Sequence, residues 1–201
     1  VYYDNECSIE EVGMYYSDDY NFINEDFSIN WELFDKLQSD IFKDSKFNLK
    51  NRLESSNHEG EKFTWDHTQN VVKSAQTVDI PKSVDRRLLV LAALFHDFGK
   101  PLKNEDHGLD ATILTDKIFN NSNEYKFVRL AIRHHMNLWQ NDDTLLQTIV
   151  DDIDEHGFNR NDFIDFLLAL NKSDILSGKT LDDFDKFSGK LKKDAIIEQH
   201  D

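Results

Sequence analysis

The strongest constraint on the fold is the run 88–95, which is apolar at every position. A helix that is apolar on all sides has no face for water, so it belongs in the middle of a protein. His96 and Asp97 follow this run directly, and Gly99 and Pro101 are expected to end the helix. We therefore expect an imidazole and a carboxylate at the end of the most buried helix.

The rest of the chain is also expected to be helical, because residues that favour turns are scarce. The 201 residues include 7 Gly and 2 Pro, whereas average usage would give about 14 and 10. From residue 30 on, apolar residues recur at steps of three and four, as on one face of a helix. The predicted fold is all-α, a compact bundle of about 6–8 helices in residues 29–201, with its motifs in 58–180. We predict helices near 31–41, from about residue 66, and at 83–95, 107–120, 124–139, 143–156, 161–177 and 181–198.

The charge of the chain is unevenly distributed. Its formal net charge is −16, and half of that lies in residues 1–28, which hold eight acidic residues and no Lys or Arg. This segment lacks a clean periodicity, so it is expected to be an irregular acidic N-terminal arm or a short β element. Duplex nucleic acid and anionic membranes attract clustered Lys and Arg. The composition therefore argues against non-specific binding to either, and the arm is the expected place for a protein partner.

The sequence predicts a cytoplasmic protein. Its single cysteine, Cys7, permits neither an intramolecular disulfide nor a cysteine-based zinc site, which fits a reducing compartment. No apolar run approaches the roughly 18 residues of a membrane span, and the first residues show no charged-then-apolar pattern, so no secretory leader is expected.

Three features single out part of the chain's histidines and acids. A lone histidine on a helix is usually packed or solvent-facing, but His96-Asp97 ends the buried run, His134-His135 forms a pair, and Asp174 interrupts an apolar helix. An ionised carboxylate is costly to bury without a cation beside it. Imidazoles and carboxylates without thiolates are ligands for Mn, Fe, Co, Ni or Zn. His58 is expected in a loop that could bring it to a pocket rim, and the acidic run 151–155 is expected on a solvated helix face.

In their order and spacing, His67, His96-Asp97 and Asp174 resemble the motif of the HD-domain metal-dependent phosphohydrolases. The resemblance covers about residues 50–180. Gly99-Lys100 after the doublet, and the segment 58–68, resemble the HD domain attached to bacterial tRNA nucleotidyltransferases and poly(A) polymerase-type proteins. The catalytic head of those nucleotidyltransferases has no counterpart in this chain.

The resemblance implies a site for one or two divalent metal ions (Mn, Fe, Ni, Co, Mg or Zn). One ion would be held by His67, His96, Asp97 and Asp174. The second oxygen of Asp97 would serve another ion, with its ligands completed by His107 and by His134 or His135. Two ions about 3.5–4 Å apart would activate a water and clamp an in-line displacement at phosphorus.

The resemblance also implies a function, the hydrolysis of phosphate mono- or diesters of nucleotides or RNA ends by a metal-activated water. Asp97 and Lys100 are the predicted catalytic residues, and Lys100 and Arg133 are predicted to bind the substrate phosphate. The expected substrate is a small nucleotide or a short nucleic-acid end. A different interpretation stays open, in which the chain is a non-catalytic helical accessory module with a structural metal. One closed ion would favour that module, and two ions with open positions would favour catalysis.

Overall fold

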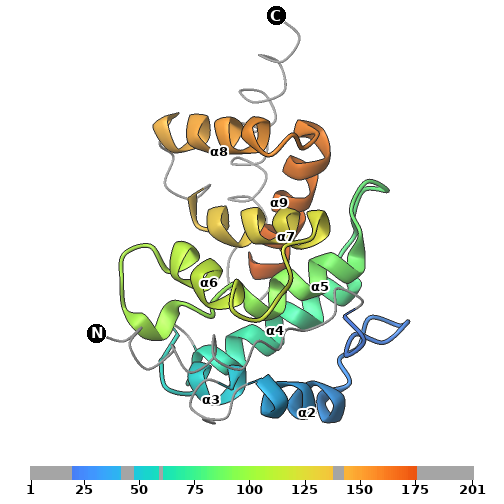
Figure 1. The fold of residues 1–201 in the computed structure, drawn as a ribbon, viewed down its shortest axis with the longest axis vertical. Coiled ribbons are helices and arrows are strands. Elements are labelled where there is room, and N and C mark those ends of the chain that lie inside the picture. Colours follow the sequence, from blue (N-terminus) through green and yellow to red (C-terminus); the bar gives the residue numbers. More distant parts are fainter. Residues whose placement is uncertain (1–19, 42–47, 59–60, 138–142, 176–201) are drawn as a thin grey trace, which may run out of the picture.

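A computed structural model describes residues 20–41, 48–58, 61–137 and 143–175, and within them it contains eight α-helices and no strand (Figure 1). The predicted all-α fold is thereby confirmed. The helices are α2 (Trp31–Ile41), α3 (Leu49–Leu53), α4 (Thr64–Thr77), α5 (Arg86–Phe95), α6 (His107–Thr115), α7 (Asn123–His134), α8 (Asp143–Glu155) and α9 (Arg160–Ile175), with a 3-10 helix, η3 (Lys100–Leu102), between α5 and α6.

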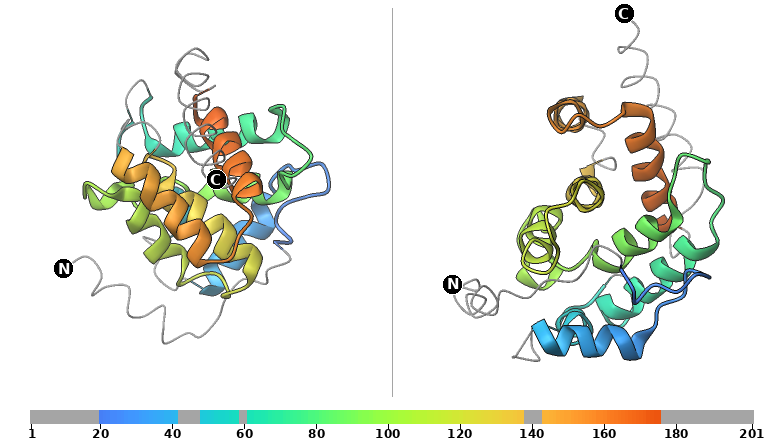
Figure 2. Two further views of the ribbon diagram at one scale, coloured as in Figure 1. Left: turned by 90° about the horizontal axis from the view of Figure 1, so that it is seen from above. Right: turned by 45° about the vertical axis from the view of Figure 1, so that its right-hand side comes forward.

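Helix α5 lies in the centre of the molecule, as its composition predicts. All its side chains from Leu88 to Phe95 are buried, and α4, α7 and α9 pack against it. The side chain of Asp85 caps its N-terminus by accepting from the backbone N–H groups of Arg87 and Leu88. Figures 1 and 2 show α8 at one end of the molecule and α2 with α3 at the other. The end of α5 therefore lies in the interior, between the two.

Several helix boundaries differ from the predicted ones. Helix α5 begins at Arg86 rather than at residue 83 and ends at Phe95, as predicted, and Pro101 stands at the start of η3, where its missing N–H removes no bond. Helix α6 ends at Thr115 instead of continuing to residue 120. Helix α3, which the sequence did not suggest, is capped by the side chain of Asn48 and anchored by buried leucines. The predicted helix 181–198 lies outside the described residues.

Part of the segment expected to form an acidic arm packs into the core. Tyr20, Phe22 and Ile23 are buried there, and Ile23 forms an isolated antiparallel bridge with Ile29. The carbonyl oxygen of Tyr20 accepts a hydrogen bond of 2.7 Å from Nη2 of Arg87. The segment after residue 19 is therefore anchored to the start of α5, whereas most of the acidic residues of the arm lie outside the described residues.

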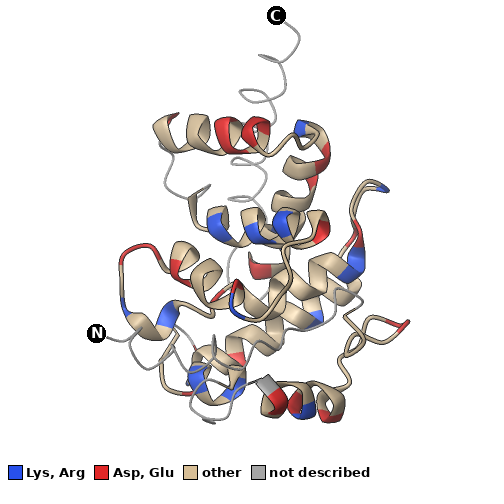
Figure 3. Cartoon of the chain, in the orientation of Figure 1, with Lys and Arg blue, Asp and Glu red and all other residues tan. Residues whose placement is uncertain are grey.

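Basic and acidic side chains gather on different helices. Figure 3 shows Lys and Arg along α7, and Asp and Glu in α8. The acidic run 151–155, expected on a solvated face, is partly engaged: Asp154 pairs with Arg160 at 2.6 Å, and Asp152 contacts His134 at 2.7 Å. None of the described helices combines the length and the apolar character that crossing a bilayer requires.

Candidate metal centre

The carboxylate of Asp97, in the turn after α5, stands at the centre of a buried polar cluster. Its Oδ2 lies 3.2 Å from Nε2 of His96 and 3.6 Å from Nε2 of His67, a residue of α4. The same nitrogen of His67 lies 2.9 Å from Oδ1 of Asp174, near the end of α9. The structure therefore brings together the four residues expected to hold a first metal ion.

The second oxygen of Asp97 faces a separate pair of imidazoles. Oδ1 lies 3.3 Å from Nε2 of His107, at the start of α6, and 3.6 Å from Nε2 of His135, directly after α7. The two Nε2 atoms are 3.1 Å apart. Asp97, His107 and His135 thus offer three ligand atoms close enough to share one metal ion. Asp97 is common to both groups, with one oxygen turned toward each.

Helix ends orient two of these imidazoles. Nδ1 of His96 lies 2.6 Å from the carbonyl oxygen of Ala93, and Nδ1 of His135 lies 2.5 Å from that of Ile132. A carbonyl oxygen only accepts, so each Nδ1 carries the hydrogen. Both histidines directly follow a helix C-terminus, where the last carbonyls lack the usual partner four residues on and can accept from a side chain. This arrangement directs both Nε2 atoms toward Asp97.

The charges in the cluster strongly influence one another. Burial disfavours a charged His96, but the carboxylates of Asp97 and Asp174 outweigh burial and raise the pKa of His96 to about 9. Burial also disfavours an ionised Asp97, yet the charge of His96 and hydrogen bonds from His107 and His135 hold the pKa of Asp97 well below its usual range. Burial instead lowers the pKa of His135, which favours its neutral form.

Two atoms in the middle of the cluster are left without hydrogen bonds. Nε2 of His96 and Oδ2 of Asp97 are both buried and unbonded within the part of the chain that the structure describes, because their mutual geometry is not that of a hydrogen bond. Such atoms are rare in proteins and indicate a missing partner. A divalent cation would satisfy both, and the imidazole and carboxylate donors match the preferences of Mn, Fe, Co, Ni and Zn. The residues therefore fit a metal.

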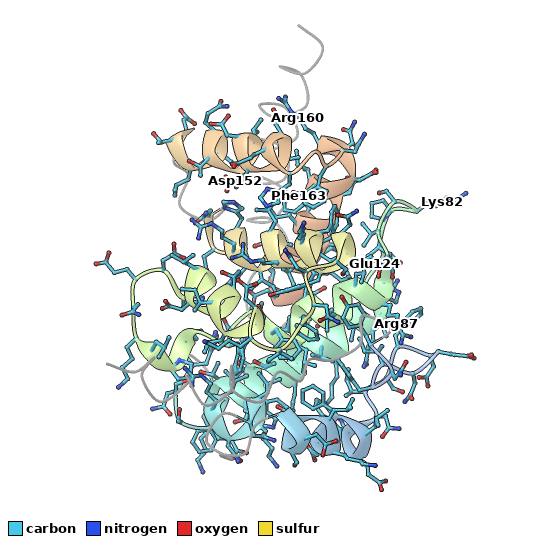
Figure 4. The ribbon with its side chains drawn as sticks, viewed as in Figure 1. Lys82, Arg87, Glu124, Asp152, Arg160 and Phe163 are labelled. Atoms are coloured by element: carbon cyan, nitrogen blue, oxygen red, sulfur yellow. The ribbon has the colours of Figure 1, made fainter. Side chains whose placement is uncertain are left out.

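His134 lies apart from this cluster. Its Nε2 lies 2.7 Å from Oδ2 of Asp152, and its Nδ1 lies 2.7 Å from the side-chain nitrogen of Asn137. Figure 4 shows Asp152 between α8 and α7. Consecutive residues of a helix point about 100° apart, so His134 and His135 face different neighbours. The metal role predicted for His134 therefore gains no support from the structure.

The two predicted phosphate contacts differ in position. Lys100 in η3 places its Nζ 3.6 Å from Oδ2 of Asp97, with 27% of its side chain exposed. Lys100 therefore contacts the buried cluster and is also partly open to solvent. Arg133 is half-buried on α7, and within the described ranges it pairs with no carboxylate of the cluster.

The structure adds Glu61 to the residues around His67, and it gives His58 a definite place. Oε2 of Glu61 lies 2.9 Å from Nδ1 of His67. The ring of His58 stacks on the ring of His67, with centroids 3.7 Å apart and planes 8° apart. Sequence reasoning considered His58 for the pocket rim but missed Glu61. The one sequence signal for Glu61 was its position close to His58 and His67, and this acquires meaning only because the backbone N–H of Glu61 meets the carbonyl oxygen of His58.

Comparison with known proteins agrees with this geometry. Residues 64–156 match the family model described as HD domain. The matched range contains His67, His96, Asp97, His107 and His135, and it ends before Asp174. Neither the curated proteins nor the solved structures gave a match. HD domains are typical of metal-dependent phosphohydrolases and bind divalent metals, so the match and the cluster together support the HD superfamily for this chain.

Proposed function

We propose that this chain is a divalent-metal-dependent phosphohydrolase that cleaves phosphate mono- or diesters of nucleotides or RNA ends. The observation that carries the proposal is the position of Asp97, whose two oxygens face two separate imidazole groups. A carboxylate shared in this way suits a pair of cations on either side of it. Bound divalent ions supply a Lewis acid for the phosphoryl group and make water nucleophilic at neutral pH.

The residues of the chain contribute positioning and charge. The surrounding imidazoles keep Asp97 ionised, as its lowered pKa indicates, so its two oxygens remain available as ligands. Lys100 is the cation best placed to meet a substrate, because its Nζ lies 3.6 Å from Oδ2 of Asp97 while part of its side chain reaches solvent. A fixed positive charge beside the reacting phosphate favours the more negative transition state.

The substrate class is argued from charge and from resemblance. A net charge of −16 disfavours long nucleic acid, which binds through many phosphate contacts. A small nucleotide or a short nucleic-acid end needs only a few contacts at the site. The likeness of segment 58–68 and of Gly99-Lys100 to the HD domain of tRNA nucleotidyltransferases supports substrates of this kind.

A direct test measures hydrolysis of an aryl phosphate monoester and an aryl phosphate diester with Mn²⁺, Co²⁺, Ni²⁺ or Mg²⁺. We expect turnover with at least one ion, and its loss together with metal binding in Asp97→Ala. Asp162→Ala, which removes an exposed carboxylate in the first turn of α9, serves as the control and should stay active. A folded wild-type protein that holds one ion tightly and turns over neither ester would contradict the proposal and favour the accessory module.

A further inference from the structure

We infer that Glu61 is a positioning residue that fixes the imidazole of His67 and strengthens it as a ligand. The inference rests on the metal centre of the proposed function, and it concerns a residue that the metal groups themselves do not include. Glu61 lies before α4, and its side chain is 17% exposed, whereas that of His67 is 4% exposed. Glu61 therefore stands between the buried cluster and the surface.

The contact between Glu61 and His67 determines which nitrogen of the His67 ring carries the hydrogen. Oε2 of Glu61 lies 2.9 Å from Nδ1 of His67, which is a normal length for a charge-assisted hydrogen bond. An ionised carboxylate only accepts, so Nδ1 carries the hydrogen. Nε2 then points the other way, toward Oδ1 of Asp174 at 2.9 Å and Oδ2 of Asp97 at 3.6 Å. This is the side on which a metal ion would lie.

Glu61 is itself held in place. Its Oε1 accepts a hydrogen bond of 2.6 Å from the side-chain nitrogen of Asn70, one helical turn beyond His67 on α4. Its backbone N–H donates to the carbonyl oxygen of His58 at 3.1 Å, which closes the turn before α4. The ring of His58 covers one face of the His67 ring. Asn70 therefore holds the carboxylate of Glu61, and the hydrogen bond to His58 holds its backbone.

The direction of the helices explains why His67 requires a carboxylate. His96 and His135 follow helix C-termini, and their rings use backbone carbonyls of the last helical turn as acceptors. His67 instead lies in the first turn of α4, the end of a helix at which backbone N–H groups, and not carbonyls, lack partners inside the helix. Its own backbone N–H donates to the carbonyl oxygen of Phe63. At this end of the helix the acceptor for Nδ1 of the ring is the carboxylate of Glu61. A carboxylate acceptor also makes the imidazole a better metal ligand than a carbonyl would.

The test compares Glu61→Ala, Glu61→Gln and the wild type by Zn²⁺ affinity, measured in competition with a chelator. We expect Glu61→Ala to weaken binding by about 10- to 100-fold, the usual cost of losing such a partner. Glu61→Gln keeps an acceptor without the charge and should lose less. Glu54→Ala, which removes another carboxylate close in the chain, 4.0 Å from Nζ of Lys50, is the matched control and should bind as the wild type does.

Proton–nitrogen NMR of the His67 ring supplies a readout independent of metal and activity. In the metal-free wild type, we expect the Nδ1–H proton at low field because of the carboxylate, and we expect it to move upfield in Glu61→Ala. The Nδ1–H protons of His96 and His135 are internal controls and should not move. Unchanged Zn²⁺ affinity or an unchanged His67 signal in Glu61→Ala would overturn the inference, as would a Zn²⁺ ion found on Nδ1. A wild type that binds no Zn²⁺ refutes the metal centre instead, and the metal-free spectrum then still decides on Glu61.

Discussion

Gly99 packs directly against the backbone of His107. A Cβ at position 99 would overlap the carbonyl oxygen of His107 and lie 2.5 Å from the backbone nitrogen of Ala111. Gly108 makes the same kind of approach on the other side of α6, where an added Cβ would lie 2.5 Å from the carbonyl oxygen of Arg133. Two glycines thus let α6 lie close to the end of α5 and to α7, which brings His107 within reach of Asp97.

This packing predicts the effect of Gly99→Ala. The atoms that the new methyl group would meet belong to the backbone and cannot rotate away, so α6 must move as a unit. We expect a loss of about 1–3 kcal/mol in the free energy of unfolding, the usual cost of overpacking. Because His107 moves with α6, the metal group that includes it should also weaken. Denaturant unfolding and a count of bound metal per chain measure the two effects.

A substitution at Gly157 supplies the comparison. Gly157 has a φ of +71° and nothing within 4 Å of an added Cβ. Asn tolerates this left-handed conformation better than most residues do. Gly157→Asn should therefore leave metal binding as in the wild type. Equal metal loss in both glycine variants would contradict the packing argument.

A second prediction concerns protons released by metal binding. The pKa of His96 is raised to about 9, so its imidazole is protonated at pH 7 in the metal-free protein. A metal ligand must be deprotonated, and metal binding at pH 7 should therefore release a proton from His96. The release should diminish as the pH rises through about 9, and the apparent affinity should increase up to that pH. Calorimetry in two buffers of different ionisation enthalpy measures the number of protons.

The outcome that would contradict this prediction is a binding enthalpy at pH 7 that does not depend on the buffer. His96→Ala is the useful comparison, because it removes the titrating group. Its remaining metal binding, measured at higher metal concentration, should release fewer protons than that of the wild type.

The central part of the site could be predicted from the sequence because burial and charge conflict there. An apolar run that ends in His96 and Asp97 requires a partner for the carboxylate wherever the helix lies. The distance of Asp174 from this doublet along the chain says nothing about distance in space. That residue, like His67 and His107, could be connected with the doublet only through resemblance to a family whose motif has the same order.

Other parts of the site depend on details that spacing does not determine. Whether His134 or His135 faces Asp97 is decided by the rotation of α7 about its own axis, because consecutive residues point about 100° apart. Glu61 reaches His67 only because the chain turns back at His58. The segment from residue 20 looked like part of an irregular arm because its buried aromatic residues follow no helical or strand period.

The two neighbouring histidines of α7 should behave differently when each is replaced. His135→Ala removes a member of the group formed with Asp97 and His107, so it should reduce the metal bound per chain. His134→Ala should keep the metal content, because its nitrogens contact Asp152 and Asn137 instead. We expect it to cost about 1–2 kcal/mol in unfolding free energy through the lost hydrogen bonds. Metal analysis and denaturant unfolding of both variants check this, and metal loss in His134→Ala would contradict it.

Lys100 offers the sharpest separation of substrate binding from metal binding. Nζ of Lys100 lies 3.6 Å from Oδ2 of Asp97. An ammonium group has no lone pair with which to bind a cation, so Lys100→Met should leave the metal content unchanged. Losing its charge beside the phosphate should lower kcat/KM for an aryl phosphate by about 100-fold. Lys103→Met, at an exposed position just after η3, is the matched control and should retain full activity. Equal activity of Lys100→Met and the wild type would show that this ammonium group meets no substrate phosphate.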